Sequence, residues 1–279
     1  MRVVDRSDSD PAAGFARLAQ RRHRARFGHT ILWRARTDST NAWVRRLAAG
    51  GVREGVVAVA DGQETGRGRH GRPWESPGGL GLYCSLLVRP RLPHEQLGLL
   101  PLAAGVAAAA AVRRLCRIPA LLQWPNDLVA GTRKLGGVLV ETSMKGGRVQ
   151  ASIVGWGLNL GQRRSDFSTA LRRRATSLRL LRAAVPGRAA LLSIWLSALE
   201  RCLARLERGE TLPLLRRFGA LSPSARGARL VVQIDGRRCR ALSCGLEPDG
   251  SLRVELPQGE RILRSAEVLR VLGVEPCSS

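Results

Sequence analysis

The chain of 279 residues carries a formal net charge of +24 at pH 7 and is long enough for one large domain and a small one. Of its 46 basic residues only Lys134 and Lys145 are lysines, which leaves 44 arginines. Surfaces selected for phosphate usually mix both residues, so this near-complete replacement of lysine indicates a composition shared by the whole genome. The charge alone therefore neither establishes nor excludes nucleic-acid binding, although it favours anionic ligands.

Membrane spans and disulfides are not indicated either. The most apolar stretch, residues 97–112, is shorter than the roughly 20 residues of a membrane span and contains a proline, so we expect a buried helix. The six cysteines have no C-x-x-C spacing and no zinc spacing with the four histidines, which is typical of free thiols in a reducing compartment. Aspartates near the N-terminus argue against a targeting segment. We expect a soluble cytoplasmic protein that binds no membrane.

In chain order, the pattern divides into three parts. Residues 1–28 form a polar, Arg-rich N-terminal arm with one short helical patch. Strands and helices alternate over residues 29–224: we expect strands at "ILWRAR", "VVAVA", "LYCSLLV", "GVLVET" and "QASIVGWGLNL", and helices after "TDSTN", across the alanine-rich stretch, and near residues 189–206 and 212–218. Asp38 or Ser39 is expected to cap the first of these helices. Residues 225–279 show short strands with turn signals, the pattern of a small β-barrel.

The loop "DGQETGRGRHGRPWESPGGLG", residues 61–81, contains the pattern G-x-G-x-x-G after an apolar strand. In a dinucleotide-binding fold the third glycine of that pattern opens a helix that binds pyrophosphate. Pro73, Pro77 and the glycines beside them prevent a helix here. We interpret the segment as a flexible cationic loop whose guanidinium and backbone N–H groups face an anionic ligand. The alternative is a solvated charged loop.

Two further segments contain candidate ligand-binding residues. In "QWPNDLVAGTRKLGGVLVE", Lys134 follows an Asn-Asp pair and remains in a chain that has lost nearly all its lysines; its compact charge is not reproduced by arginine. In "GWGLNL", residues 155–160, small residues let the backbone approach a ligand and Asn159 supplies an amide. Neither lysine precedes Ser or Thr, which excludes a P-loop, and no G-x-S-x-G is present.

Five motifs together resemble one family: "DSTN" at 38–41, "GRGRHGRPW" at 66–74, "WPNDL" at 124–128, "KLGGVLVE" at 134–141 and "GWGLN" at 155–159 occur in the order and approximate spacing of biotin protein ligases. The resemblance covers residues 30 to about 270. It implies an α+β fold, with a catalytic domain over residues 29–224 similar to class II aminoacyl-tRNA synthetases and an SH3-like barrel over 225–279. It also implies an enzyme that uses MgATP to form biotinyl-5′-adenylate and then transfers biotin to a lysine of the biotin carboxyl carrier protein of acetyl-CoA carboxylase.

The resemblance implies roles for particular residues. It also implies that Mg²⁺ accompanies ATP, with no protein ligand assigned to the ion. The implied catalytic residues are Lys134, Arg69 and Asp127. The implied biotin contacts are Ser39, Thr40, Asn41, Gln63, Gly66, Arg67, Gly68, Arg69, Lys134, Gly136, Gly137 and Gly155. The implied ATP contacts are Arg69, Arg72, Trp74, Asn126, Asp127, Lys134, Asn159 and Arg270.

The sequence departs from the family pattern at three sites, and two other functions stay open. His70 replaces another basic residue, which is expected to reduce the positive charge of the loop. Trp156 replaces a smaller aliphatic residue, so the pocket wall is expected to differ there, and "SAEV" at 265–268 replaces a more usual Ser-Gly-Glu-Val. Lipoate protein ligases share the implied architecture, but the G-R-G-R loop and the K-L-G-G strand favour biotin. Some family members are biotin-responsive repressors with an additional N-terminal DNA-binding domain; residues 1–28 are too few for one, so we expect no sequence-specific nucleic-acid binding. A homodimer remains open.

Overall fold

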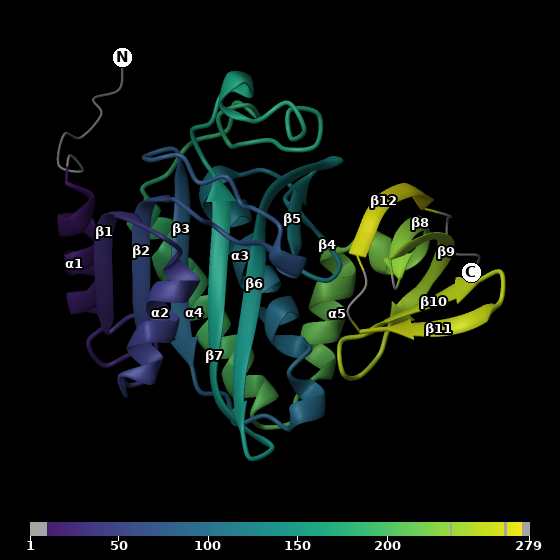
Figure 1. The fold of residues 1–279 in the computed structure, drawn as a ribbon, viewed down its shortest axis with the longest axis horizontal. Coiled ribbons are helices and arrows are strands. Elements are labelled where there is room, and N and C mark those ends of the chain that lie inside the picture. Colours follow the sequence, from purple (N-terminus) through teal and green to yellow (C-terminus); the bar gives the residue numbers. More distant parts are fainter. Residues whose placement is uncertain (1–9, 235, 265–266, 275–279) are drawn as a thin grey trace.

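The computed structural model describes residues 10–234, 236–264 and 267–274. Its larger part is built on a seven-stranded mixed sheet with the order β1-β2-β3-β7-β6-β5-β4 (Figure 1). Strand β1 pairs with β2 in parallel, and the other neighbouring pairs are antiparallel. The strands are β1 (Thr30–Thr37), β2 (Val56–Gln63), β3 (Gly81–Val88), β4 (Leu121–Gln123), β5 (Asp127–Ala130), β6 (Arg133–Lys145) and β7 (Arg148–Asn159).

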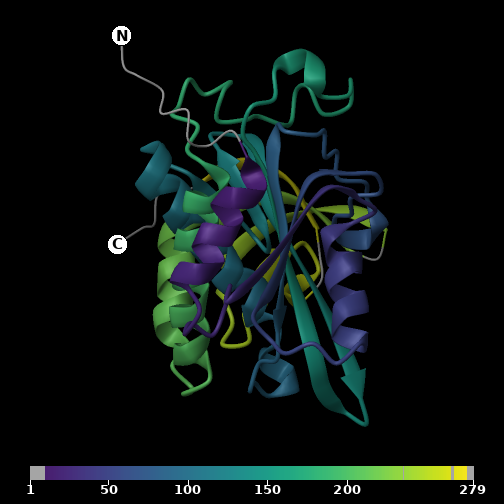
Figure 2. The ribbon, with the colours of Figure 1, turned by 90° about the vertical axis from the view of Figure 1, so that its left-hand side faces the viewer.

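Helices cover both faces of this sheet, which confirms the expected α+β class. Helix α2 (Thr40–Ala49) lies on one face, and α1 (Pro11–Arg21), α3 (Leu99–Cys116) and α4 (Arg188–Leu206) lie on the other (Figure 2). Successive residues of β2 point to opposite faces, so Val57 and Val59 pack in the core with α3 and α4 while Ala58 packs beneath α2. Burial on both faces explains why "VVAVA" is continuously apolar.

The alanine-rich stretch is the buried helix that its sequence predicts. Among the described residues, His94–Cys116 is the helical segment long and apolar enough to cross a membrane by length and composition alone, with a mean hydropathy of 1.5. In the structure 72% of its most apolar window is buried, because α3 packs between the sheet, α4 and α5 (Leu212–Leu221). Its apolar surface is therefore covered by this chain's own elements.

The described part of the predicted N-terminal arm packs against the larger domain. Phe15 and Leu18 of α1, and Phe27 after it, are buried in the main core. Arg22 donates to Glu200 of α4 at 2.9 Å, so polar contacts reinforce the apolar ones. Residues 10–28 thus belong structurally to the sheet and its helices, because the regular apolar positions among the arginines face inward.

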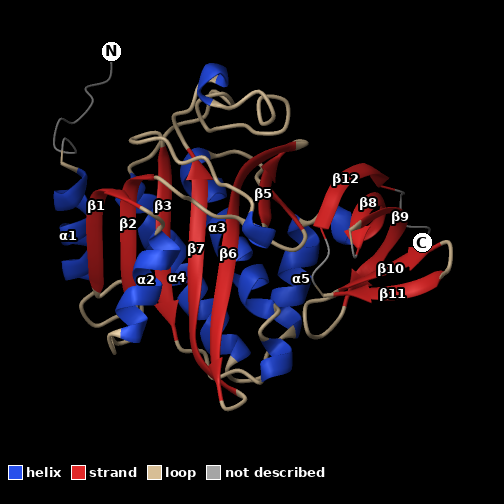
Figure 3. Cartoon of the chain, in the orientation of Figure 1, coloured by secondary structure: helices blue, strands red, loops and turns tan. Residues whose placement is uncertain are grey.

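The second part is a five-stranded antiparallel sheet with the order β11-β10-β9-β8-β12. Figure 3 shows that strands make up most of this part, in contrast to the helix-covered larger sheet. Trp124 Nε1 donates to the Gly250 carbonyl at 3.0 Å, in the turn before β10, and joins the two parts. The strands are β8 (Arg226–Ile234), β9 (Arg237–Leu246), β10 (Leu252–Leu256), β11 (Gly259–Leu263) and β12 (Glu267–Val274).

Candidate active site

The start of α2 brings the "DSTN" motif against the sheet. Ser39 is the N-cap residue, but its side chain makes no cap hydrogen bond. Gln63, at the end of β2, caps the helix instead, since the Thr40 N–H donates to its Oε1 at 2.8 Å. Asp38 pairs with Arg46 at 2.7 Å, and hydrogen bonds from that guanidinium hold the pKa of the Asp38 carboxyl well below its usual range. The sequence-based expectation thus gives the right N-cap position, Ser39, but the wrong acceptor, because a residue distant in sequence accepts from the helix N–H.

Two glycines of β7 let side chains lie flat on the sheet. A Cβ at position 155 would lie 2.3 Å from Asn41 Oδ1, and a Cβ at position 157 would lie 2.8 Å from the Trp74 indole. Trp156, between them, points to the other face, where its ring stacks on Trp195 of α4 with centroids 5.3 Å apart. This large residue therefore has its ring packed in the core, and it still belongs to the lining of the neighbouring cavity, as expected from the sequence.

The G-R-G-R loop is folded back on itself by its own hydrogen bonds. Gly68 N–H donates to the Arg72 carbonyl at 2.7 Å, and Trp74 N–H donates to the Gly66 carbonyl at 2.9 Å. Arg69–Gly71 forms a single 3-10 turn in which His70 has φ +57°, a left-handed conformation unusual for a residue with a side chain. No α-helix begins here, as the prolines and glycines predict. The loop presents Arg67, Arg69 and Arg72 to one cavity.

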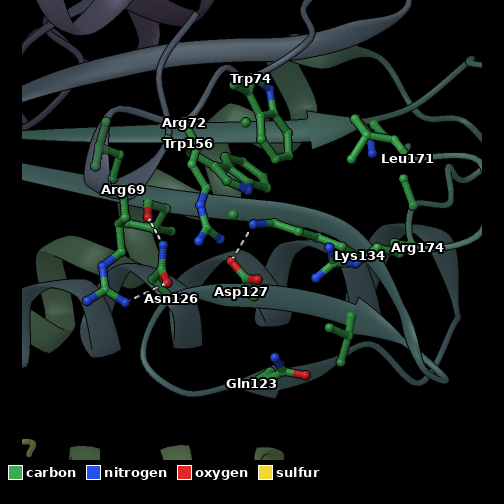
Figure 4. Close-up of a pocket in the computed structure, with 18 of the residues that line it drawn as sticks. Arg69, Arg72, Trp74, Gln123, Asn126, Asp127, Lys134, Trp156, Leu171 and Arg174 are labelled. Carbon is green, nitrogen blue, oxygen red and sulfur yellow. Dashed lines mark hydrogen bonds and ion pairs between the residues drawn. The ribbon is translucent and has the colours of Figure 1, made fainter. Parts of the chain in front are cut away.

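Lys134 lies across this cavity in an ion pair (Figure 4). Its Nζ lies 2.6 Å from Asp127 Oδ1 and 5.4 Å from the centre of the Trp74 ring, within cation–π range. Asn126 is fixed beside the pair, because its Nδ2 donates to the Val138 carbonyl at 2.6 Å. A Cβ at Gly137 would lie 3.3 Å from both Asp127 Oδ1 and Lys134 Cε, so a glycine gives the pair its space.

The cavity has a volume of about 950 Å³, at the upper end of the usual range for small-molecule sites. It brings together most of the residues that the sequence singles out. Gly66 and Gly136 do not line it; each lets a neighbouring backbone approach, since added Cβ atoms would lie 2.5 Å from the Trp74 carbonyl oxygen and 2.6 Å from the Gly157 carbonyl oxygen. Arg270 lies in β12, and its side chain is outside the described residues. The predicted residues that line the cavity are Ser39, Thr40, Asn41, Gln63, Arg67, Gly68, Arg69, Arg72, Trp74, Asn126, Asp127, Lys134, Gly137, Gly155 and Asn159.

The structure adds lining residues from a loop that sequence reasoning missed. Arg173 and Arg174, in the segment between β7 and α4, line the cavity. Arg174 lies near Lys134 (Figure 4). The segment is held there because Lys134 N–H donates to the Arg174 carbonyl and Thr176 N–H donates to the Lys134 carbonyl, each at 2.8 Å. The signal available in the sequence was the run of three arginines at 172–174. It was hidden by the general excess of arginine.

Carboxylates are scarce in this cationic cavity, where Asp127 and Glu75 are among the lining residues. Within the described ranges, no group of three or more His, Cys, Asp or Glu side chains could hold a metal ion. A magnesium ion here would need phosphate oxygens and waters for most of its ligands.

The class of protein follows from the fold, the cavity and a family comparison. Residues 33–159 match the model of the biotin/lipoate A/B protein ligase family. The bifunctional ligase/repressor BirA of Escherichia coli is 32% identical over 240 residues, which cover 82% of this chain and 73% of that protein. The biotin--[acetyl-CoA-carboxylase] ligase of Mycobacterium tuberculosis is 34% identical over 234 residues, 82% of this chain and 76% of that one.

A solved structure supports the same grouping. The biotin protein ligase from Aquifex aeolicus in complex with biotin and ATP superposes with a TM-score of 0.73 and 28% identity, covering 86% of this chain and 99% of that one. The chain spans about half the length, 46%, of the bifunctional ligase/repressor BirA of Bacillus spizizenii, to which it is 35% identical over 151 residues. The chain belongs to the biotin protein ligase family.

Proposed function

We propose that the protein is an ATP-dependent biotin protein ligase, which activates biotin as biotinyl-5′-AMP and transfers it to a specific lysine of a biotin carboxyl carrier protein, typically that of acetyl-CoA carboxylase. The observation that carries the proposal is the single cavity in which the Lys134–Asp127 pair, the G-R-G-R loop and the Thr40–Gln63 contact meet. The names of the M. tuberculosis relative and the A. aeolicus structure support the same reaction.

The first half-reaction brings two anions together, and the cavity supplies positive charge for it. A carboxylate oxygen of biotin attacks the α-phosphorus of ATP in line, and pyrophosphate leaves. Lys134 and Arg69 offset the charge that accumulates on the carboxylate and phosphate oxygens. In our assignment Arg72, Arg173 and Arg174 face the triphosphate, Trp74 packs near the adenine, and Asn126, Asp127 and Asn159 provide polar contacts to the nucleotide. Arg270 is assigned to the nucleotide side from the resemblance alone.

The divalent ion enters as MgATP. Magnesium usually keeps several waters and takes one or two carboxylates together with substrate phosphates, so Asp127 and Glu75 fit such a complex although they form no cage of their own. When bound, the ion would supply positive charge that offsets the charge of the phosphates.

The second half-reaction needs access for a protein lysine. Its amine attacks the acyl carbon of the adenylate, and AMP leaves. Until then the adenylate must be kept from water, and the G-R-G-R loop and the segment 161–186 are assigned as its covers. We assign residues 29–224 to a class II synthetase-like catalytic domain, 225–279 to an SH3-like barrel and 1–28 to an N-terminal arm, in a cytoplasmic protein that needs no sequence-specific nucleic acid.

The deciding experiment is incubation with biotin, MgATP and an isolated carrier domain, followed by intact-mass measurement. A biotin adduct on one carrier lysine is expected, and no adduct would contradict the proposal. Lipoate is the second candidate acid, because the matched family model covers both ligases. ATP–pyrophosphate exchange driven by lipoate but not by biotin would favour it.

A further inference from the structure

A buried glutamine lies behind the cavity wall with its amide in an orientation that needs an explanation. Gln162, three residues after the end of β7, is 1% exposed. Its Nε2 donates to Asn159 Oδ1 at 3.2 Å and to the Tyr83 hydroxyl at 3.4 Å. Its Oε1 is buried and has no hydrogen-bond partner among the residues that the structure describes. A buried acceptor without a partner is costly, so something must hold the amide this way round.

The contacts of Gln162 end at two backbone carbonyls, which explain that orientation. The Tyr83 hydroxyl donates to the Pro77 carbonyl at 3.3 Å, and Asn159 Nδ2 donates to the Thr176 carbonyl at 2.9 Å. Because a carbonyl oxygen can only accept, the Tyr83 oxygen and Asn159 Oδ1 are left to face Gln162 as acceptors. The two hydrogens on Gln162 Nε2 match these two acceptors, whereas its oxygen turned the same way would oppose both. The amide therefore keeps its nitrogen there and leaves Oε1 without a partner.

Through Asn159, this amide acts on the segment that crosses the cavity wall. The Thr176 peptide group is held from both sides, since its N–H donates to the Lys134 carbonyl at 2.8 Å and its carbonyl accepts from Asn159. The next residue is tied to the same place, because the Ser177 hydroxyl donates to the Gln162 carbonyl at 2.7 Å. Asn159 lines the cavity, whereas Gln162 lies outside the lining.

We infer that Gln162 is a positioning residue for the nucleotide side of the cavity: by donating to Asn159 it fixes that amide as a donor to the segment at 174–176. The inference rests on the proposed function, in which Arg173 and Arg174 face the triphosphate. Both arginines line the cavity directly before the point where Asn159 holds the chain. A looser hold at Thr176 thus lets them move away from ATP.

The test uses Gln162→Met in the full chain, which keeps most of the side-chain volume and removes both donated hydrogens. Asn159 Oδ1 is then buried without a donor, and turning the amide would only set two oxygens against each other at Thr176. The KM for ATP should rise on the order of 10-fold, the change expected for one buried hydrogen bond. Biotin affinity, measured by calorimetry without ATP, should stay that of the parent, because the residues assigned to the ureido ring lie on α2 and β2.

Limited trypsin digestion measures the hold on the segment without any activity. The Arg174 carbonyl accepts from the Lys134 N–H, so the bond after Arg174 is cut only when the segment lifts. Gln162→Met should speed that cut, located by mass spectrometry, while the cut after the exposed Arg53 keeps the rate of the parent. Gln162→His, whose ring N–H can still donate to Asn159, should remain closer to the parent in both measurements.

Two further variants separate positioning from general destabilisation. Because Gln162 acts through Asn159, adding Gln162→Met to Asn159→Leu should raise the KM for ATP no further. Ser152→Ala is the matched control: it removes a buried hydroxyl contact of 2.9 Å with Thr142 elsewhere in β7 and should change neither ATP use nor the cut after Arg174.

Three results would overturn the inference: additive effects in the double variant, a cut after Arg174 that Gln162→Met does not speed, or an equal loss of biotin and ATP affinity. A parent that forms no biotinyl-adenylate would instead overturn the proposed function, and the digestion would still decide whether Gln162 holds the segment.

Discussion

Lys134 and Asp127 form an ion pair inside the cavity, with Nζ and Oδ1 2.6 Å apart. The aspartate holds the lysine over the cavity before any substrate arrives, which reduces the ordering that the reaction itself must provide. Both side chains are partly exposed, so the pair contributes little to the stability of the fold.

Replacing Lys134 with Met should keep the packing of the side-chain stem and remove its charge. Adenylation brings a carboxylate against a phosphate, so we expect its barrier to rise by about 3 kcal/mol, roughly 100-fold in rate. ATP–pyrophosphate exchange measures this step, and transfer from supplied biotinyl-adenylate should suffer less. Equal loss in both half-reactions would mean that the role of the lysine is assigned wrongly.

Gly155→Ala should weaken biotin binding more than it weakens the fold. The new Cβ would lie 2.3 Å from Asn41 Oδ1, so Asn41 must leave its place between Ser85 and Glu141. A loss of about 1–3 kcal/mol in biotin affinity is expected from the broken buried contacts. Gly78→Ala is the control, because a Cβ there meets no atom within 4 Å. If both variants bind biotin alike in calorimetry, the close approach at position 155 is not needed for the site.

Arg69→Gly should loosen the loop that covers the intermediate. The substitution removes a guanidinium 3.5 Å from Asn126 Oδ1 and adds backbone freedom next to the left-handed His70, so closure costs more entropy. Because Lys134 remains, adenylation should survive while retention of the adenylate does not. Incubation with biotin, MgATP and serum albumin should then label albumin lysines, which the parent leaves unlabelled.

The control for that experiment is Arg53→Gly, an exposed arginine outside the cavity lining. It should label albumin no more than the parent does. An Arg69→Gly variant that forms adenylate and releases it no faster than the parent, as timed by stopped-flow fluorescence, would show that the loop does not act as a cover.

The charge of +24 should give weak, non-specific DNA binding with a steep salt dependence, because such binding is driven by counterion release. Fluorescence anisotropy with random duplexes at several salt concentrations measures the slope. We expect no sequence preference; one operator bound at least ~10³-fold tighter than random DNA would contradict this.

The sequence predicts the elements of the larger domain well, because their signals are local. The continuous apolar run "VVAVA" marks β2, buried on both faces, and the alanine-rich stretch marks α3, with its proline in the first turn where the helix tolerates it. The motif lysine was found because it is rare. Gln63 as the cap of α2 could not be found this way, since only the parallel pairing of β1 with β2 brings residues 40 and 63 together.

Residues behind the site were missed for a related reason. Ser85 stands in the apolar strand "LYCSLLV" and Glu141 near the exposed end of β6, and neither has a local signal for a ligand. Their connection through Asn41 depends on the order β3-β7-β6 in the sheet and on α2 lying across it. The packing of Phe15 and Phe27 was likewise hidden among surrounding arginines.

The backbone of Lys134 makes two hydrogen bonds to the segment at 174–176, one through its N–H and one through its carbonyl. The amide protons of Lys134 and Thr176 can therefore exchange with solvent only when that segment lifts from β6. Their exchange rates measure how often the cavity opens on this side, and a bound adenylate that holds the segment down should slow both amides by the same factor. The exchange rates of these two amides thus report how often the segment opens to give an acceptor lysine access to the cavity.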